Sequence, residues 1–343
     1  MQTEITTPGP LLSHKGLLTQ PGYARFPFLK YDRSQIRAGL HGLPKRLRVK
    51  EWDYYGVITD RYFFSVCVSD VGYIGLVFAY FIDFESGEIY LDQVITPFGA
   101  DCHLPDTSES GDIFFSNARV DVGFLREPEK RHIRTSWKNM GGVDVSADFA
   151  IRQPQEWQGI VMATPMERGC FYYNHKLNGM PVSGNLEIGG RKMDLGADRA
   201  LACLDWGRGV WPYSTFWNWA SGSGYLHDGR ILGLNLGSGF GDLSAATENS
   251  VFVDGVMSKL GWVDLQYSSK SLFSPWLFTE ESGRLHLRFT PIFRRKENTN
   301  LAILRSKVNQ MFGRYNGYVI TDEGESIEVV NMIGWAEEHY ARW

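Results

Sequence analysis

The feature that most constrains the fold of this chain is a two-residue alternation of apolar and polar residues, broken at short intervals by glycine-containing turns. Residues 143–151 largely alternate in this way, as do residues 285–289 and 327–329. Alternation with this period is typical of strands that bury one face. Because such strand patterns follow one another without regular helical patterns between them, the sequence predicts an all-β fold of antiparallel barrels or sandwiches.

The length of 343 residues exceeds the usual size of a single hydrophobic core, so two domains are expected. Residues 1–50 are rich in proline, glycine and basic residues and show little periodicity, which favours an extended N-terminal arm. We expect a first barrel over residues 51–190 and a second over residues 191–343, and we expect the candidate site, with Asp205, inside the second barrel. Helices should be few and short, and the best candidates are residues 301–312 and 335–343.

Charge and hydropathy exclude some classes of partner. The formal net charge of −4 gives no general electrostatic drive toward nucleic acid. The longest apolar run, residues 73–82, is about half of the ~20 residues that a membrane helix needs, so no integral membrane segment is expected. Transient contact with a membrane surface stays open. The chain begins without the basic and apolar regions of a signal peptide, and its cysteines are far apart, which favours a cytoplasmic protein.

The sequence shows no local motif for a cofactor or a metal ion. Residues 237–241 are rich in glycine, but they do not match GxGxxG and no clear helix follows them. The eight histidines show no pairing at helical ligand spacing. We therefore expect neither a cofactor nor a metal site.

The strongest candidate for chemistry lies within residues 204–220. Asp205 and Arg208 stand there among four tryptophans, namely Trp206, Trp211, Trp217 and Trp219. Burial against large rings, or a neighbouring cation, can shift the pKa of a carboxyl group, and a pocket of this kind suits proton chemistry on an apolar substrate. The alternative is a core of rings in which Asp205 and Arg208 form an internal ion pair. Strand alternation would place Asp205 and Trp206 on opposite faces.

Two further groups of residues can belong to the same pocket. Glu248 and Asn249 follow the glycine-rich segment and either line the cavity or serve as turn residues. Residues 50–55, with the sequence KEWDYY, interleave charges with large rings. They form either a lip of the pocket or an interior row of rings with charges outside.

Together these motifs resemble a bacterial family of uncharacterised proteins. The resemblance rests on KEWDYY at 50–55, DWGRGVWP at 205–212, WNWA at 217–220 and GLNLG at 233–237, and it covers nearly the whole chain. More remotely, the chain is similar to the double-lipocalin group that contains carotenoid 1,2-hydratase, tocopherol cyclase, AttH-like proteins and some fungal pericyclases. This resemblance implies two lipocalin-like antiparallel barrels in one chain.

The remote relatives carry out cofactor-free acid chemistry on isoprenoid or polyketide skeletons. In the hydratase, an aspartate is thought to protonate an alkene, and Asp205 looks like the corresponding residue. The hydratase pattern has a histidine close to its aspartate, whereas this chain has Trp206 and Arg208 there. The resemblance implies protonation of an isoprenoid-like substrate, followed by hydration, cyclisation or isomerisation.

In this interpretation Asp205 is the proton donor, and Glu248 orients water or ligand and is the next candidate for the acid. Arg208 holds Asp205 or an oxygen-bearing end of the ligand. The other predicted ligand contacts are Trp206, Trp211, Tyr213, Trp217, Asn218, Trp219 and Asn249. Two alternatives stay open: a non-catalytic carrier of a lipid or isoprenoid pigment, and a structural protein whose cavity is filled by its own side chains.

Overall fold

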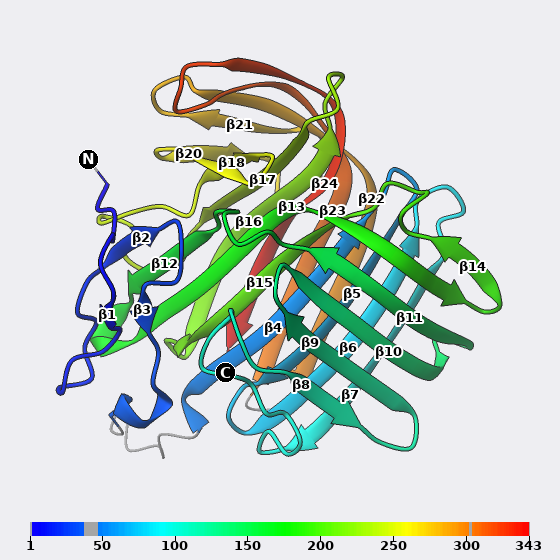
Figure 1. Cartoon of the computed structure of the whole chain (residues 1–343), viewed down its shortest axis with the longest axis horizontal. Helices are drawn as coiled ribbons and strands as arrows, with labels where there is room; N and C mark the ends of the chain where they lie inside the picture. Colours follow the sequence, from blue (N-terminus) through cyan, green and yellow to red (C-terminus); the bar gives the residue numbers. More distant parts are fainter. Residues whose placement is uncertain (1, 38–46, 302–303, 343) are drawn as a thin grey trace.

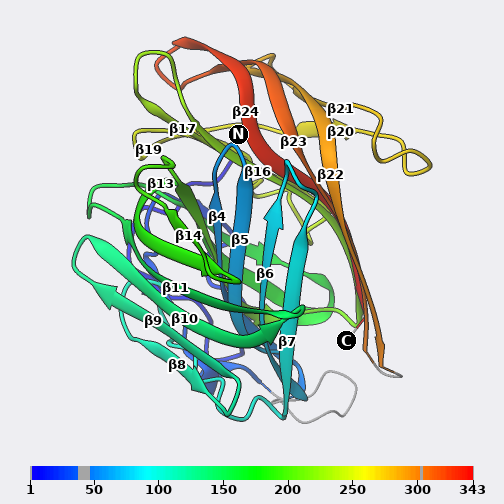
Figure 2. The ribbon, with the colours of Figure 1, turned by 90° about the vertical axis from the view of Figure 1, so that its right-hand side faces the viewer.

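The computed structural model describes residues 2–37, 47–301 and 304–342. Two large antiparallel sheets curl and face each other (Figure 1, Figure 2). The first sheet has 13 strands, ordered β7-β6-β5-β4-β15-β13-β11-β10-β9-β8 along its main path, with β2, β12 and β14 attached. The second has nine strands in the order β19-β18-β17-β16-β24-β23-β22-β21-β20. The predicted all-β fold of two barrel-like sheets is confirmed.

The first sheet is built from the following strands: β2 (Gly22–Ala24), β4 (Val49–Ile58), β5 (Tyr62–Asp70), β6 (Ile74–Asp83), β7 (Ile89–Pro97), β8 (Ile113–Ser116), β9 (Val120–Glu127), β10 (Lys130–Met140), β11 (Val143–Arg152), β12 (Ile160–Pro165), β13 (Phe171–Ile188), β14 (Arg191–Asp194) and β15 (Leu201–Val210). The second sheet comprises β16 (Ser214–Tyr225), β17 (Ile231–Ser238), β18 (Ser250–Val253), β19 (Val256–Lys259), β20 (Val263–Gln266), β21 (Trp276–Glu280), β22 (Leu285–Leu301), β23 (Leu304–Ile320) and β24 (Ser326–Arg342). In the described chain, helix is limited to short 3₁₀ turns such as η1 (Arg33–Gln35) and η4 (Glu167–Gly169).

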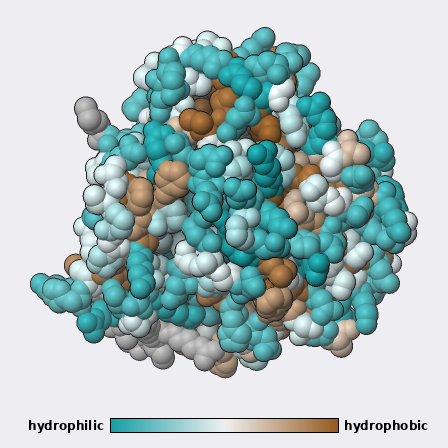
Figure 3. All heavy atoms as spheres, viewed as in Figure 1, coloured by the Kyte–Doolittle hydropathy of each residue, from teal (hydrophilic) through white to brown (hydrophobic). Residues whose placement is uncertain are grey.

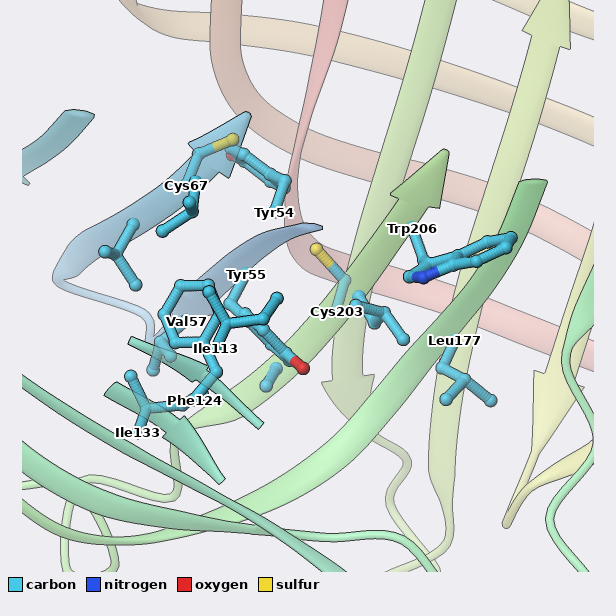
Figure 4. Packing of buried hydrophobic residues seen from close by; sticks show 14 of the residues in the cluster. Tyr54, Tyr55, Val57, Cys67, Ile113, Phe124, Ile133, Leu177, Cys203 and Trp206 are labelled. Atoms are coloured by element: carbon cyan, nitrogen blue, oxygen red, sulfur yellow. The ribbon is translucent and has the colours of Figure 1, made fainter. Parts of the chain in front are cut away.

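The first sheet curls until its edge strand β7 meets the β8–β11 region. Arg119, which precedes β9, forms an ion pair of 2.6 Å with Asp92 of β7. Buried apolar side chains such as Tyr55, Val57, Phe124 and Ile133 fill the interior (Figure 4). Side chains therefore fill the interior of the first barrel, and the ligand-sized cavity of the protein lies elsewhere.

Both predicted helices near the C-terminus are wrong. Residues 304–312 lie in β23 and residues 335–342 lie in β24, while residues 302–303 and 343 lie outside the described residues. Met311 and Ala336 pack in the core of the second sheet, but their neighbours Phe312 and Trp335 pack in the core shared with the first sheet. A strand buried on both faces loses the two-residue alternation, so its sequence cannot be distinguished from a buried helix by period.

The chain enters the second sheet later than the sequence analysis expects. Strands β14 and β15, at residues 191–210, pair within the first sheet, and the second sheet begins at β16. Alternation shows that a segment is a strand but not which strand it pairs with, so the change of sheet is not readable from the pattern.

The N-terminal segment packs along the body of the protein. Strand β1 (Gly9–Pro10) pairs with β3 (Leu29–Lys30), and β2 adds to β12. The face seen in Figure 3 is largely hydrophilic, with apolar side chains in separate areas. Within the described chain, no helix combines the length and the apolar character needed to cross a bilayer.

Candidate active site between the two sheets

A cavity of about 210 Å³ lies between the two sheets. Strand pairing places one row of cavity residues across the first sheet, in the order Lys176, Asp205, Tyr54, Cys67, Phe78 and Gln93. The facing row in the second sheet is Trp219, Glu337, Gln310 and Arg295. Hydrogen bonds connect the rows, because the Tyr54 and Tyr80 hydroxyls are 3.0 Å apart and the Tyr80 hydroxyl donates to Gln310 Oε1 at 2.9 Å.

Aromatic rings form much of the cavity wall, namely Trp52, Tyr172, Trp211, Trp217, Trp219 and Phe240. Trp52 stacks on Tyr172 with ring centroids 5.5 Å apart, and Trp211 meets both rings edge-on. The Trp52 indole lies over β15 because residue 207 is glycine. A Cβ atom at Gly207 would lie 2.2 Å from Trp52 Cζ2. Gly207 of the 205–212 motif thus leaves the space that the Trp52 ring occupies in the cavity wall.

Asp205 lines the cavity, and its side chain is 14% exposed. Burial raises the pKa of this carboxyl group, and the nearby Lys176 ammonium opposes that effect. The distance from Lys176 Nζ to Asp205 Oδ2 is 3.9 Å. Asp205 Oδ1 is buried and has no hydrogen-bond partner among the described residues. Buried polar atoms are usually satisfied, so this oxygen marks a position for a proton, a water molecule or a ligand group.

Lys176 is the central cation of the site. It is 1% exposed, and its Nζ lies 3.0 Å from Glu248 Oε2. The ammonium also lies over the rings of Trp219 and Phe240, at 4.5 and 5.3 Å from their centroids. Burial alone lowers the pKa of a lysine, but the Asp205 and Glu248 carboxylates outweigh it, so the pKa of Lys176 is raised. Lys176 therefore stays charged inside the molecule.

Two titratable groups face the cavity from β24. Burial raises the pKa of Glu337 to about 7, although Arg295 and Lys176 act in the opposite direction. Burial lowers the pKa of His339 to about 3, so its imidazole is neutral. The His339 ring lies 4.0 Å from the Trp217 ring, and its Nε2 is 2.9 Å from Ser306 Oγ.

Four of the residues predicted from the sequence lie at the cavity: Asp205, Trp211, Trp217 and Trp219. Trp52 and Tyr54 of the KEWDYY segment line it as well, whereas Tyr55 packs inside the first barrel. Their roles in binding or catalysis stay predictions.

The ion pair weighed between Asp205 and Arg208 does not form. Arg208 Nη2 pairs with Asp53 Oδ1 at 2.8 Å, and its guanidinium lies 4.2 Å from the Trp206 ring centroid. Trp206 packs against Tyr173. Because β15 alternates, Arg208 and Trp206 occupy the face opposite to Asp205, inside the first barrel.

The remaining predicted residues also lie away from the cavity wall. Tyr213 is 50% exposed, and Asn218 donates to Tyr267 Oη and to the Glu337 carbonyl. Asn249 accepts from the Gly237 amide and donates to the Gly261 carbonyl, which is a structural role. Glu248 is buried outside the cavity wall and contacts the site through its ion pair with Lys176.

Sequence reasoning missed several residues that line the cavity: Tyr172, Lys176, Phe240, Arg295, Gln310, Glu337 and His339. For Lys176 a signal was present, because residues 171–177 place a lysine among large rings just as residues 50–55 do. Glu337 and His339 fell within the segment interpreted as a terminal helix.

A second, larger groove of about 1090 Å³ lies beside the β16–β17 turn and the start of β24. Charged groups of this groove form ion pairs at the surface, as Arg230 does with Glu325 at 2.7 Å. At the smaller cavity, burial displaces the pKa values of Asp205, Glu337 and His339, which makes that cavity the candidate functional site. Among the described residues, no group of three or more His, Cys, Asp and Glu side chains is placed to hold a metal ion.

The fold and the cavity define a class: an all-β protein of two curled sheets with ionisable side chains enclosed between them. The chain belongs to the family described as a domain of unknown function, DUF2804, whose model matches residues 2–343. No curated protein matches the sequence.

The chain is similar to several solved structures, among them the following three. Kievitone hydratase from Nectria haematococca is 10% identical, with a TM-score of 0.51, and the match covers 85% of this chain and 88% of that one. A putative AttH from Nitrosomonas europaea is 14% identical, with a TM-score of 0.49 and coverage of 87% and 94%. CghA is 10% identical, with a TM-score of 0.45 and coverage of 86% and 88%. At these identities the likeness to kievitone hydratase shows a shared fold.

Proposed function

We propose that this protein is a cofactor-independent enzyme that transfers protons to and from an apolar, isoprenoid-like substrate, leading to hydration, cyclisation or isomerisation. The observation that carries the proposal is the position of Asp205. This carboxyl group lines an aromatic cavity, its pKa is raised by burial, and one of its oxygens has no hydrogen-bond partner among the described residues. Asp205 is the group that exchanges a proton with the substrate.

The aromatic wall suits the cation that forms when an alkene is protonated. A cation over an aromatic face is stabilised by ~0.5–2 kcal/mol. Lys176 already uses the faces of Trp219 and Phe240 in this way. The rings of Trp52, Tyr172, Trp211 and Trp217 supply further π faces in the same cavity.

The cavity volume limits what reacts there. A cavity of roughly 150 Å³ in an engineered protein core holds benzene, and the cavity here is about 210 Å³. It therefore accommodates one ring or a short branched alkene segment. Ile95 lines the cavity and is 44% exposed, so the cavity reaches the surface along β7. A longer apolar chain would enter by its reactive end and extend outward there.

The fold shared with kievitone hydratase supports hydration as one outcome of this chemistry. The competing function is a carrier that binds the same apolar molecule without changing it. A carrier needs the aromatic wall, but it has no use for a carboxyl group with a raised pKa beside a buried lysine.

Native mass spectrometry of the purified protein tests the proposal. We expect an apolar molecule to co-purify with the wild type and to be absent from Cys67→Phe, which fills the cavity from the Asp205 row. Conversion of that molecule during incubation indicates an enzyme. A bound molecule that stays unchanged at wild-type Asp205 indicates the carrier and contradicts the proposal.

A further inference from the structure

Glu337 lines the cavity together with the carboxyl groups of Asp205 and Glu297. It lies on β24, is 7% exposed, and stands between Trp219 and Gln310 in the strand register. Its row faces the row that carries Asp205. Carboxyl groups from two different sheets therefore line one small cavity.

The buried groups around Glu337 contain more carboxyl groups than cations. Lys176 lies 3.0 Å from Glu248 and 3.9 Å from Asp205, so its charge is shared by those two residues. The other nearby cation, Arg295, forms an ion pair with Glu297. Within the described chain, no ion pair of 4.0 Å or less includes Glu337. Charge balance thus leaves Glu337 as the carboxyl group that most readily keeps its proton.

The net effect of the surroundings is to raise the pKa of Glu337. Burial raises its pKa to about 7, Arg295 and Lys176 lower it, the Asp205 carboxylate raises it, and a hydrogen bond with Trp217 lowers it. Tyr80 also faces this region and stays neutral, because burial raises its pKa to about 12. His339, two residues further on β24, is neutral too. Near neutral pH, a substantial share of Glu337 is the uncharged acid.

We propose that Glu337 is the proton donor of the site and that Asp205, held as a carboxylate beside Lys176, is the base. This inference rests on the function proposed above. It reverses the direction expected for Asp205 from the sequence. The Lys176 ammonium lies 3.9 Å from Asp205 and opposes the rise in pKa that burial causes there, whereas no ion pair within the described chain includes Glu337. Two carboxyl groups whose environments differ commonly divide the acid and base roles in this way.

The steps balance as follows for hydration. The Glu337 carboxylic acid gives its proton to one alkene carbon, the π electron pair forms the new C–H bond, and the other carbon becomes a cation. A water oxygen bonds to that carbon, and Asp205 takes a proton from the water. In isomerisation or cyclisation, Asp205 instead takes a proton from a carbon next to the cation. Proton exchange with solvent then restores both groups.

Infrared difference spectroscopy locates the stored proton without any substrate. Spectra of the full chain on the acidic and basic sides of pH 7 should differ by the carbonyl stretch of a protonated carboxylic acid. Glu337→Gln should lose this band, whereas Glu328→Gln, an exposed change on the same strand, should keep it. Asp205→Asn should also keep it, with a lower midpoint, because the Asp205 charge raises the pKa of Glu337.

The outcomes separate this inference from the proposed function. The inference is overturned if the wild type shows no such band, if Glu337→Gln retains it, or if Asp205→Asn loses it. Melting temperatures of all variants show whether a missing band reflects unfolding. Turnover is measured separately. An intact band in a protein that converts no isoprenoid substrate contradicts the proposed function alone.

The pH profile of turnover gives a second test of which carboxyl group donates the proton and which accepts it. In the wild type, the limb on which kcat/KM falls with rising pH should lie near pH 7, where Glu337 loses its proton. The residual activity of Glu337→Gln should lack that limb, whereas the residual activity of Asp205→Asn should retain it. If Glu337→Gln kept this limb of the profile and Asp205→Asn lost it, the inference would be contradicted.

Discussion

Lys176 connects the charged residues of the cavity. Its ammonium contacts Asp205 and Glu248 and lies over the ring of Trp219. An ammonium, two carboxylates and an aromatic face are thereby held in one desolvated cluster. A cluster of this kind costs stability to assemble, since each charge must leave water. Its position at a cavity, rather than within a packed core, favours a catalytic reason for keeping it.

At Asp205, the substitution Asp205→Asn separates catalysis from binding. Asparagine keeps the shape of aspartate but cannot take part in carboxyl proton transfer, so turnover should fall by about 10²–10⁴-fold while ligand affinity changes little. Steady-state kinetics and ligand titration measure the two quantities. The matched control is Asp242→Asn, which lies in an exposed turn and should leave both unchanged. Wild-type turnover in Asp205→Asn would remove this residue from the mechanism.

At Lys176, the substitution Lys176→Met should destabilise the protein. Removing the cation leaves Asp205 and Glu248 buried together without their partner, and breaking a buried pair in this way costs about 3–5 kcal/mol. Urea denaturation measures the free energy of unfolding. Lys192→Met is the control, because that lysine is 78% exposed and a surface pair is worth about 1 kcal/mol or less. Equal losses in the two variants would show that Lys176 does not balance buried charge.

Because the pKa of Glu337 is raised in the folded protein, the contribution of this residue to the free energy of unfolding should decrease as the pH rises. The carboxyl group titrates at 4.5 in its ordinary state and at about 7 in the folded protein. Between these values the folded state holds more protons, so this contribution to stability is present at low pH and is lost as the pH rises toward 7. The full contribution amounts to roughly 3 kcal/mol.

The variant Glu337→Gln isolates that contribution. Burial lowers the pKa of His175 to about 4 and that of His339 to about 3, so both histidines weaken the protein as the pH falls below 6.5. They are unchanged in Glu337→Gln, and the difference between variant and wild type removes their effect. The stability of the variant relative to the wild type should therefore rise between pH 4.5 and about 7. A constant difference over that range, measured by urea denaturation, would contradict the protonation state inferred for Glu337.

At the scale of the strands, register decides which side chains meet. The cavity row of the first sheet collects residues from β13, β15, β4, β5, β6 and β7, which are separated by long stretches of sequence. The motif at 205–212 predicted Asp205 and the aromatic character of the site, because those features are local. The sequence around Lys176 carries a similar local signal, but the proximity of Lys176 and Glu337 to Asp205 could not be predicted, since it arises only from strand pairing and sheet packing.

Strand β24 illustrates why period alone misassigns some elements. Trp335 and Glu337 face the first sheet, whereas Ala336 faces the core of the second. Both faces of this part of β24 are therefore buried, and no exposed polar face remains to show the two-residue alternation of a strand. By contrast, β11 has one face on the core and one toward solvent, and its alternation was read correctly.

Gly207 gives a prediction for strand β15. In Gly207→Ala the new methyl group would occupy the position of the Trp52 indole and push the ring from the cavity wall. Overpacking of this kind costs about 1–3 kcal/mol, and ligand affinity should fall with it. Gly123→Ala on β9 is the control, because the nearest atom to the added carbon is 3.5 Å away. Thermal melting and ligand titration test the pair, and an unaffected Gly207→Ala would show that Trp52 does not depend on this glycine.

At the scale of the whole molecule, the site belongs to neither sheet alone. Asp205 and Lys176 come from the first sheet, and Glu337 and Arg295 come from the second. The sequence predicted two barrel-like units and a cavity within one of them, whereas the structure places the cavity between the sheets. Because the curled sheets face each other over aromatic side chains, the same packing that stabilises the molecule also encloses the acidic groups.

The proposed function requires this cavity to move protons onto an apolar substrate. Incubation of the wild type in deuterated water with a panel of monoterpene, sesquiterpene and diterpene alcohols tests it most directly. An acid whose proton exchanges with solvent would place deuterium on a product carbon, detectable by mass spectrometry. We predict carbon-bound deuterium with the wild type and Asp242→Asn, and a loss of about 10²–10⁴-fold in its rate with Asp205→Asn. Binding of these alcohols by the wild type without deuterium entering any carbon position would contradict the proposed function.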